Sequence, residues 1–219
     1  MNRRQFHLSS LATTLGLGGL AALGSTPAGA QASDIVEGRD FRRLETTAPV
    51  PSHGKIDVVE FFWYGCPHCY ALEPALDAWV EKLPADVVFR RMPVTFAALH
   101  EGHAKMFFAL EALGQLPKLH KTIFTALHVQ RRRLDRADDM AAFVAEHGVG
   151  REAFLDAFNA FGVASKVRQS RQLSEAYRLE GVPALGIQGR FLTSGSLAGS
   201  NEKALRVADL LIARSRRPG

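Results

Sequence analysis

Residues 57–70 read Asp57-Val-Val-Glu-Phe-Phe-Trp-Tyr-Gly-Cys-Pro-His-Cys-Tyr70, and this stretch decides the fold. Apolar, β-branched and aromatic residues fill positions 57–64 with few interruptions, which is typical of a strand covered on both faces. A helical stretch follows from residue 66 to about residue 82, and Pro67 takes a first-turn position that tolerates proline. The segment therefore predicts a buried strand that leads directly into a helix.

The next part of the chain adds a second strand and then a long helical stretch. Residues 86–92 predict another core strand, parallel to the first across the intervening helix. From 99 to 163 the apolar residues recur at helical spacing, so we expect an all-helical insertion there. Asp135 is expected to cap one of these helices, and Gly148 to end it.

The last third of the chain returns to the sheet. After a further helix at about 164–179, the short apolar runs 181–187 and 189–193 predict a β-hairpin. Asn201 is expected to cap a final helix, and residues 214–219 form a basic tail. The expected fold class is α/β, a small sheet domain interrupted by helices.

The N-terminus has the pattern of an export signal. Arg3 and Arg4 precede an uncharged apolar run at 11–24, and Ala28-Gly29-Ala30 matches a cleavage site. The run is shorter than the ~20 residues of a spanning helix, although an uncleaved anchor is the alternative. The paired arginines resemble the twin-arginine signal. We expect a signal peptide at residues 1–30 and a discontinuous core at 31–98 and 164–213. The helical insertion is expected at 99–163 and the basic tail at 214–219.

The composition is that of an ordinary globular protein. Of the 219 residues, 47% are hydrophobic and 22% are charged, which excludes disordered, collagen-like and coiled-coil classes. The formal net charge is +5, from 27 Lys+Arg and 22 Asp+Glu. So modest a balance is weak evidence for a polyanionic partner, and we expect no nucleic-acid binding.

The chain has two cysteines, Cys66 and Cys69, and their spacing at a strand-to-helix junction is a redox signature. Unpaired backbone N–H groups and the helix dipole favour a thiolate at Cys66, while Cys69 lies one turn further on and deeper. His68 in its charged form would stabilise the thiolate further. Because a stabilised thiolate weakens the disulfide, the pair is predicted to donate disulfides.

Other interpretations of the pair have less support. A zinc site needs four ligands, and no second cysteine pair or spaced Cys/His pair accompanies this one. Haem attachment requires His directly after the second cysteine, where the chain has Tyr70. A purely structural short disulfide is the remaining alternative.

Glu60 is an acid inside an apolar strand. If it is buried, its pKa rises and it can exchange a proton with the cysteine pair; the alternative is a solvent-facing edge position. The histidines at 100, 103 and 120 are expected to be scattered surface residues, and the arginines at 131–133 a solvated run.

With Cys66-Pro67-His68-Cys69, a preceding Glu60-Phe61-Phe62 and a later Gly181-Val182-Pro183-Ala184, the chain resembles the DsbA family of bacterial periplasmic dithiol oxidants. The resemblance implies a thioredoxin fold with a helical insertion. It also implies that Cys66 is the exposed, attacked sulfur, that Glu60 is a buried proton relay, and that Val182–Pro183 is a cis-proline loop facing Cys66 and binding substrate.

The family often pairs the buried acid with a lysine, where this chain offers Arg90 or Arg91. The resemblance further implies reduced secreted proteins as substrates, a quinone-linked membrane reoxidase, and no metal or organic cofactor. We therefore expect a monomeric periplasmic dithiol oxidase. A reductase or isomerase using the same pair, and a peptide-binding chaperone module, are the alternatives.

Overall fold

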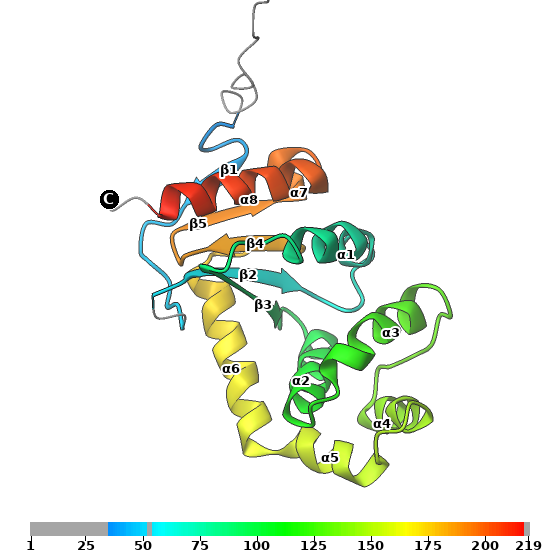
Figure 1. The fold of residues 1–219 in the computed structure, drawn as a ribbon. Coiled ribbons are helices and arrows are strands. Elements are labelled where there is room, and N and C mark those ends of the chain that lie inside the picture. Colours follow the sequence, from blue (N-terminus) through cyan, green and yellow to red (C-terminus); the bar gives the residue numbers. More distant parts are fainter. Residues whose placement is uncertain (1–34, 52–53, 217–219) are drawn as a thin grey trace, which may run out of the picture. The chain divides into compact units, whose positions relative to one another are not determined.

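The computed structural model of the chain describes residues 35–51 and 54–216, so the expected signal peptide lies outside the described residues. Within them, five strands form one sheet in the order β1-β5-β4-β2-β3 (Figure 1). β2 and β3 run parallel, and the other neighbouring strands run antiparallel. The strands are β1 (Phe41–Arg43), β2 (Ile56–Phe62), β3 (Val87–Pro93), β4 (Ala184–Ile187) and β5 (Phe191–Ser194).

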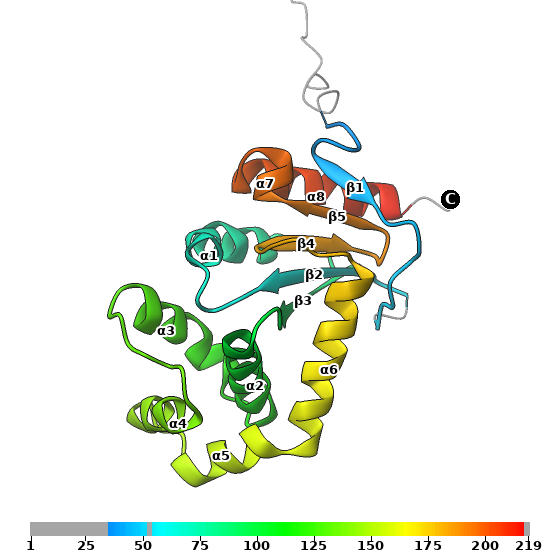
Figure 2. The ribbon, with the colours of Figure 1, turned by 180° about the vertical axis from the view of Figure 1, so that it is seen from behind.

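The helices of the described residues fall into two groups. α1, α7 and α8 lie with the sheet, whereas α2 to α5 follow β3 and form a bundle that α6 connects back to the sheet (Figures 1 and 2). The α/β class and the all-helical insertion are therefore confirmed. The helices are α1 (Pro67–Val80), α2 (Ala98–Ala112), α3 (Leu116–His128), α4 (Ala137–Glu146), α5 (Arg151–Asn159), α6 (Phe161–Ala176), α7 (Gly195–Ala198) and α8 (Asn201–Ser215).

β2 is buried along its whole length because helices cover both faces of the sheet. Alternate side chains point to opposite faces: Val58 packs in the cluster that includes α1 and α8, and Val59 in the cluster that includes α6. Glu60 has the parity of Val58 and therefore faces α1. Its side chain is fully buried, so the alternative of a solvent-facing edge position is wrong.

The predicted hairpin is confirmed and has a two-residue turn. Gln188 and Gly189 have φ values of 51° and 62°, and the N–H of Arg190 donates to the carbonyl oxygen of Ile187 at 3.0 Å. Positive φ at both turn residues matches the twist of the flanking strands. Glycine is required at the second position because a Cβ there would clash with the carbonyl oxygen of Ala48.

Two predicted helix caps are wrong. The Asp135 carboxylate accepts from the side chain of Arg133 at 3.0 Å and does not cap α4, which begins without a side-chain cap. The cap of α8 is Ser200, whose Oγ accepts from the N–H of Lys203 at 3.1 Å, and Asn201 is the first residue in the helix. The second error is a shift of one residue between neighbouring polar residues. Gly148 follows α4 with a φ of 87°, as predicted for a residue that ends a helix.

Residues 214–216, the described part of the predicted tail, belong to the folded domain. α8 runs to Ser215, and Arg216 forms an ion pair with Asp86 at 2.7 Å. Across 35–51 and 54–216, no helix has both the length and the hydropathy needed to cross a bilayer.

Candidate redox site

The first cysteine lies at the N-terminus of a helix. Cys66 is the N-cap residue of α1, and Pro67 follows as its first helical residue, where a missing N–H costs no hydrogen bond. The Sγ of Cys66 accepts from the backbone N–H of Cys69 at 3.4 Å. Both cysteines are free thiols. The sulfur of Cys66 therefore receives the unpaired N–H groups and the positive end of the helix dipole.

The two sulfurs have opposite acidities. Hydrogen bonds from the Cys69 thiol, and then from the backbone N–H groups of Cys69 and His68, lower the pKa of Cys66 to about 6 despite its burial. The charge of the exposed His68 imidazole is the smallest of these contributions. Burial raises the pKa of Cys69 far above that of an ordinary thiol, and the neighbouring Cys66 raises it further.

A loop from the other half of the domain faces this sulfur. The Val182–Pro183 peptide bond is cis, and the Cys66 thiol donates to the carbonyl oxygen of Val182 at 3.5 Å. Pro183 leads directly into β4, which pairs with β2. A cavity of about 370 Å³ opens beside the loop, with His68, Val182, Pro183 and Ser200 among its lining residues. The geometry expected of Val182 and Pro183 is therefore present.

Glu60 lies below the cysteine pair with one arginine. The Oε2 of Glu60 is 3.1 Å from the Nε of Arg91, and Arg90 turns instead to Asp57 at 2.8 Å. Complete burial raises the pKa of Glu60 to about 8, which the charge of Arg91 only partly offsets. The charge of Glu60 in turn raises the pKa of Cys69. Arg91, and not Arg90, is therefore the cation coupled to the buried acid.

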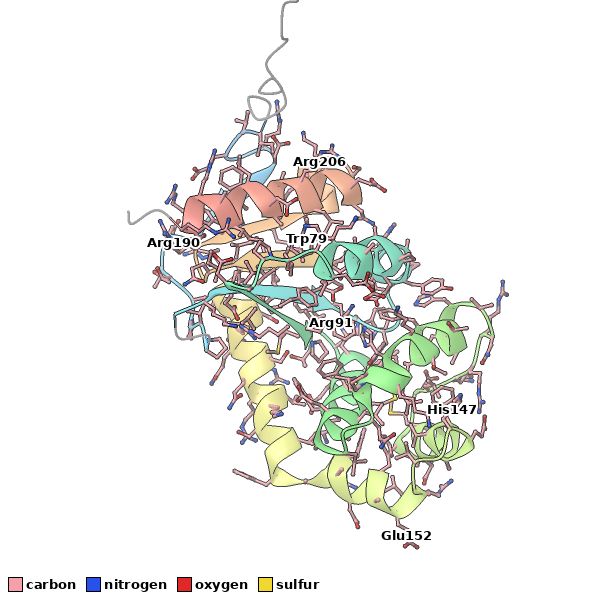
Figure 3. The ribbon with its side chains drawn as sticks, in the orientation of Figure 1. Trp79, Arg91, His147, Glu152, Arg190 and Arg206 are labelled. Atoms are coloured by element: carbon pink, nitrogen blue, oxygen red, sulfur yellow. The ribbon has the colours of Figure 1, made fainter. Side chains whose placement is uncertain are left out.

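Arg91 is shared among three carboxylates. Besides Glu60, its guanidinium lies 3.3 Å from Glu73 and 3.0 Å from Asp77, and Lys121 joins Asp77 at 2.5 Å. Figure 3 labels Arg91 where the sheet meets the helical bundle. The two buried acids of this group are Glu60 and Glu73, and they share the partly buried Arg91, because Lys121 is 70% exposed. Glu60, whose pKa is raised to about 8 by burial, is the acid that favours its protonated form at neutral pH.

Sequence reasoning missed Glu73 and Asp77. Cys69, Leu72, Glu73 and Leu76 form the buried face of α1, and Glu73 follows Cys69 by four residues. Four residues is the spacing that puts two side chains on one helix face. An acid one turn after the second cysteine was the available signal.

The insertion histidines are not scattered surface residues. His103 is buried, and its Nε2 lies 2.9 Å from the carbonyl oxygen of Leu134. His120 is also buried and contacts Tyr64, while His100 packs against Trp63 with ring centroids 4.2 Å apart. The prediction of surface positions is wrong for His103 and His120. No group of three His, Cys, Asp or Glu side chains in the described part of the chain could hold a metal ion.

Two neighbouring thiols with such different pKa values and burial are suited to thiol–disulfide exchange. The cysteine pair follows a strand of this sheet and faces a cis-proline. These features define the class of protein: a thiol:disulfide oxidoreductase with the thioredoxin fold and an all-helical insertion. The family model of the DSBA-like thioredoxin domain matches residues 92–202, which include the insertion and the cis-proline loop. The chain belongs to the DsbA family.

Relatives match over 85% to 90% of the chain, a length that extends beyond the residues matched by the family model. The chain is 44% identical over 197 residues to a thiol:disulfide interchange protein DsbA of Azotobacter vinelandii, covering 90% of this chain and 92% of that protein. It is 41% identical to the protein of the same name from Pseudomonas aeruginosa, over 85% of this chain and 89% of that protein. The crystal structure of Pseudomonas aeruginosa DsbA is similar with a TM-score of 0.81 and 40% identity, covering 84% of this chain and 96% of that one.

Proposed function

We propose that this chain is an exported dithiol oxidase that donates the Cys66–Cys69 disulfide to reduced cysteines of translocated proteins. The observation that carries the proposal is the position of Cys66 at the N-cap of α1, where its Sγ accepts from the N–H of Cys69 at 3.4 Å and its pKa is lowered from 9.0 to about 6. At pH 7 about nine in ten molecules of the reduced form then carry the thiolate, which favours that form by about 1.4 kcal/mol over an ordinary thiol. A stabler reduced form makes the disulfide a stronger oxidant, by about 30 mV for this contribution.

The proposed cycle consists of two exchanges. A substrate thiolate attacks the Cys66 sulfur, forming a mixed disulfide and releasing Cys69 as a thiolate, which takes the proton of the buried Glu60. A second substrate thiolate then attacks the substrate sulfur of that mixed disulfide. Cys66 leaves as its stable thiolate, so the substrate gains a disulfide and the enzyme is reduced. The backbone at Val182 is suited to pairing with an extended substrate segment while this happens.

The setting of the reaction is part of the proposal. The pattern of residues 1–30 supports export through a cleaved, twin-arginine-type signal peptide to the periplasm, where disulfides persist. The reduced pair would be reoxidised by a quinone-linked membrane protein of the DsbB kind. The cycle needs no metal or organic cofactor, and we expect the protein to work as a monomer without nucleic acid.

Trapping tests the proposed cycle. Cys69→Ser removes the resolving sulfur and should accumulate mixed disulfides between Cys66 and exported proteins. Cys66→Ser should abolish oxidation of a reduced substrate protein. A Cys66→Ser variant with full activity would favour a peptide-binding module. A wild-type pair that stays oxidised in strongly reducing glutathione buffers would favour a reductase or isomerase.

A further inference from the structure

α3 of the helical insertion contacts the active-site segment through two histidines: the Nε2 of His128 lies 2.8 Å from the backbone carbonyl oxygen of Tyr64, and the buried His120 contacts the Tyr64 side chain. The Nδ1 of His120 lies 2.9 Å from the hydroxyl of Tyr64, two residues before Cys66. The Nε2 of His120 lies 3.5 Å from the Oε2 of Glu73 on α1. One imidazole therefore connects the insertion to the residues before Cys66 and to the acids below Cys69.

The surroundings of this ring exclude other partners. Its faces and edges are packed by Phe62, Tyr64 and Phe124, each with its ring centroid 5.3 Å from that of His120. The Nε2 is buried and makes no hydrogen bond within the described residues, and the Oε2 of Glu73 lies 3.5 Å from it. Burial lowers the pKa of His120, which favours the neutral ring. Among the described residues, the Oε2 of Glu73 is the acceptor paired with Nε2, and a proton on Nε2 would be directed toward it.

The Tyr64 hydroxyl decides which nitrogen carries that proton. Burial raises the pKa of Tyr64 well above 10.0, so the phenol keeps its proton. Its O–H has the Nδ1 of His120 as its acceptor, and a neutral imidazole that accepts at Nδ1 carries its proton at Nε2. Tyr64 therefore turns the N–H of His120 toward Glu73.

Glu73 transmits this contact to the redox pair. Its Oε2 is also 3.3 Å from Arg91, whose Nε lies 3.1 Å from Glu60, and its Oε1 has no partner. If His120 donates a hydrogen bond to the Glu73 carboxylate, Arg91 interacts less strongly with Glu73. Arg91 then interacts more strongly with the ionised form of Glu60. The charged and titratable groups around this contact come from every packed element: Glu60 on β2, Tyr64 after it, Glu73 and Asp77 on α1, Arg91 on β3, Glu111 on α2, and Lys121 on α3.

We infer that His120 is a positioning residue of the redox reaction, which acts through Glu73 and Arg91 on the proton transfer between Glu60 and Cys69. The inference rests on the proposed role of the Cys66–Cys69 pair, but not on the direction in which disulfides are transferred. It assigns the insertion a part in the chemistry as well as in packing.

Ring closure of the reduced pair is the step to measure. Oxidised glutathione forms a mixed disulfide with Cys66 and releases one glutathione thiolate; Cys69 then loses its proton and attacks Cys66, releasing the second. For His120→Phe we expect the closure rate at pH 7 to fall at least about threefold and its pH profile to shift by at least about half a unit. His120→Gln, which can still donate to Glu73, should stay within about twofold of wild type.

Tyr64→Phe is the second variant, in case His120→Phe does not fold. It deletes one oxygen and should shift the same profile in the same direction by a smaller amount, because Nδ1 loses its donor. His147→Phe is the matched control, since His147 is the C-cap residue of α4, away from Arg91, and its imidazole Nδ1 lies 2.8 Å from the carbonyl oxygen of Phe143 (Figure 3). Its profile should equal that of wild type.

Wild-type profiles in both His120→Phe and Tyr64→Phe would overturn the inference. A fall in the closure rate that is equally large in His120→Phe and His120→Gln would also overturn the inference, because the hydrogen bond donated to Glu73 would then have no effect. A wild-type Cys66 that titrates like an ordinary thiol would defeat the proposed donor function and leave the shift in the His120 variants intact.

Discussion

The surroundings of Cys66 and those of Cys69 differ more than three residues of separation suggest. Cys66 meets backbone N–H groups at a helix start, beside the exposed Pro67 and His68. Cys69 is fully buried, above a group of acids that share Arg91. The Cys66 sulfur therefore lies beside backbone dipoles at the helix start, whereas the Cys69 sulfur lies near carboxyl groups that can gain or lose a proton.

The difference separates two properties of the enzyme. The Cys69 thiol and then the backbone N–H groups at the helix start stabilise the Cys66 thiolate, and so they set the equilibrium between oxidised and reduced forms. The acids below Cys69 decide where its proton goes, and so they set the rate of the buried step. Changes in one region should therefore leave the property of the other largely intact.

The largest expected effect concerns stability and the buried region. The pKa of Glu60 is raised from 4.5 to about 8, so its contribution to stability is complete below pH 4.5 and is lost as the pH rises through 8. The loss should be on the order of 4 kcal/mol. Urea unfolding of the oxidised protein, in which neither thiol titrates, should show this loss between pH 5 and pH 8.5.

Glu60→Gln should remove most of that pH dependence. Glu45→Gln is the control, because Glu45 makes a surface ion pair with Arg178 and is 75% exposed. If Glu60→Gln and wild type lost stability equally over this range, Glu60 would not be the acid that holds the buried proton.

The next effect concerns rate. Only ionised Glu60 can accept the Cys69 proton, and with a pKa of about 8 roughly one molecule in ten is ionised at pH 7. Glu60→Gln has no such form, so ring closure from the mixed disulfide should slow by about tenfold at pH 7, at the low end for a lost acid–base group. The thiolate titration of Cys66 should move by much less than this change in rate implies. Stopped-flow fluorescence, with either tryptophan as the reporter, measures the closure. A large shift of Cys66 without a change in closure would reverse the roles of the two regions.

The smallest effect concerns the exposed imidazole. His68→Ala should raise the pKa of Cys66 by less than about one unit, because the His68 side chain contributes least to the shift and the backbone N–H groups remain. Thiolate absorbance against pH measures it. A return to an ordinary thiol pKa in this variant would make the imidazole the main cause of the shift, in place of the Cys69 thiol and the backbone N–H groups.

Much of the fold follows from local patterns. The strand at β2, the helix after Cys66 and the turn at Gln188 and Gly189 each depend on residues close in sequence. β1 was missed because its three residues, Phe41–Arg43, include two arginines and show no alternation. It exists because β5 offers a free edge, which only the assembled sheet provides.

The site divides in the same way. The cysteine pair and Glu60 were predictable because each stands out from its neighbours in the sequence. The two cysteines fall within one helical turn, and Glu60 is an acid in an otherwise apolar strand. His120 and Asp57 were not, because their partners Tyr64 and Arg90 are 56 and 33 residues away and meet them only after folding. Pairing between distant elements is set by packing, and a single sequence does not contain it in local form.

The thiolate absorbance of the reduced wild-type protein, followed against pH, tests the central claim most directly. A single transition with a midpoint near 6, absent in Cys66→Ser and present in Cys69→Ser, is the expected result, with the midpoint moved in the second variant because the Cys69 thiol is the leading donor. A wild-type midpoint near 9.0, the value of an unperturbed thiol, would contradict the account, because nothing would then favour the reduced form.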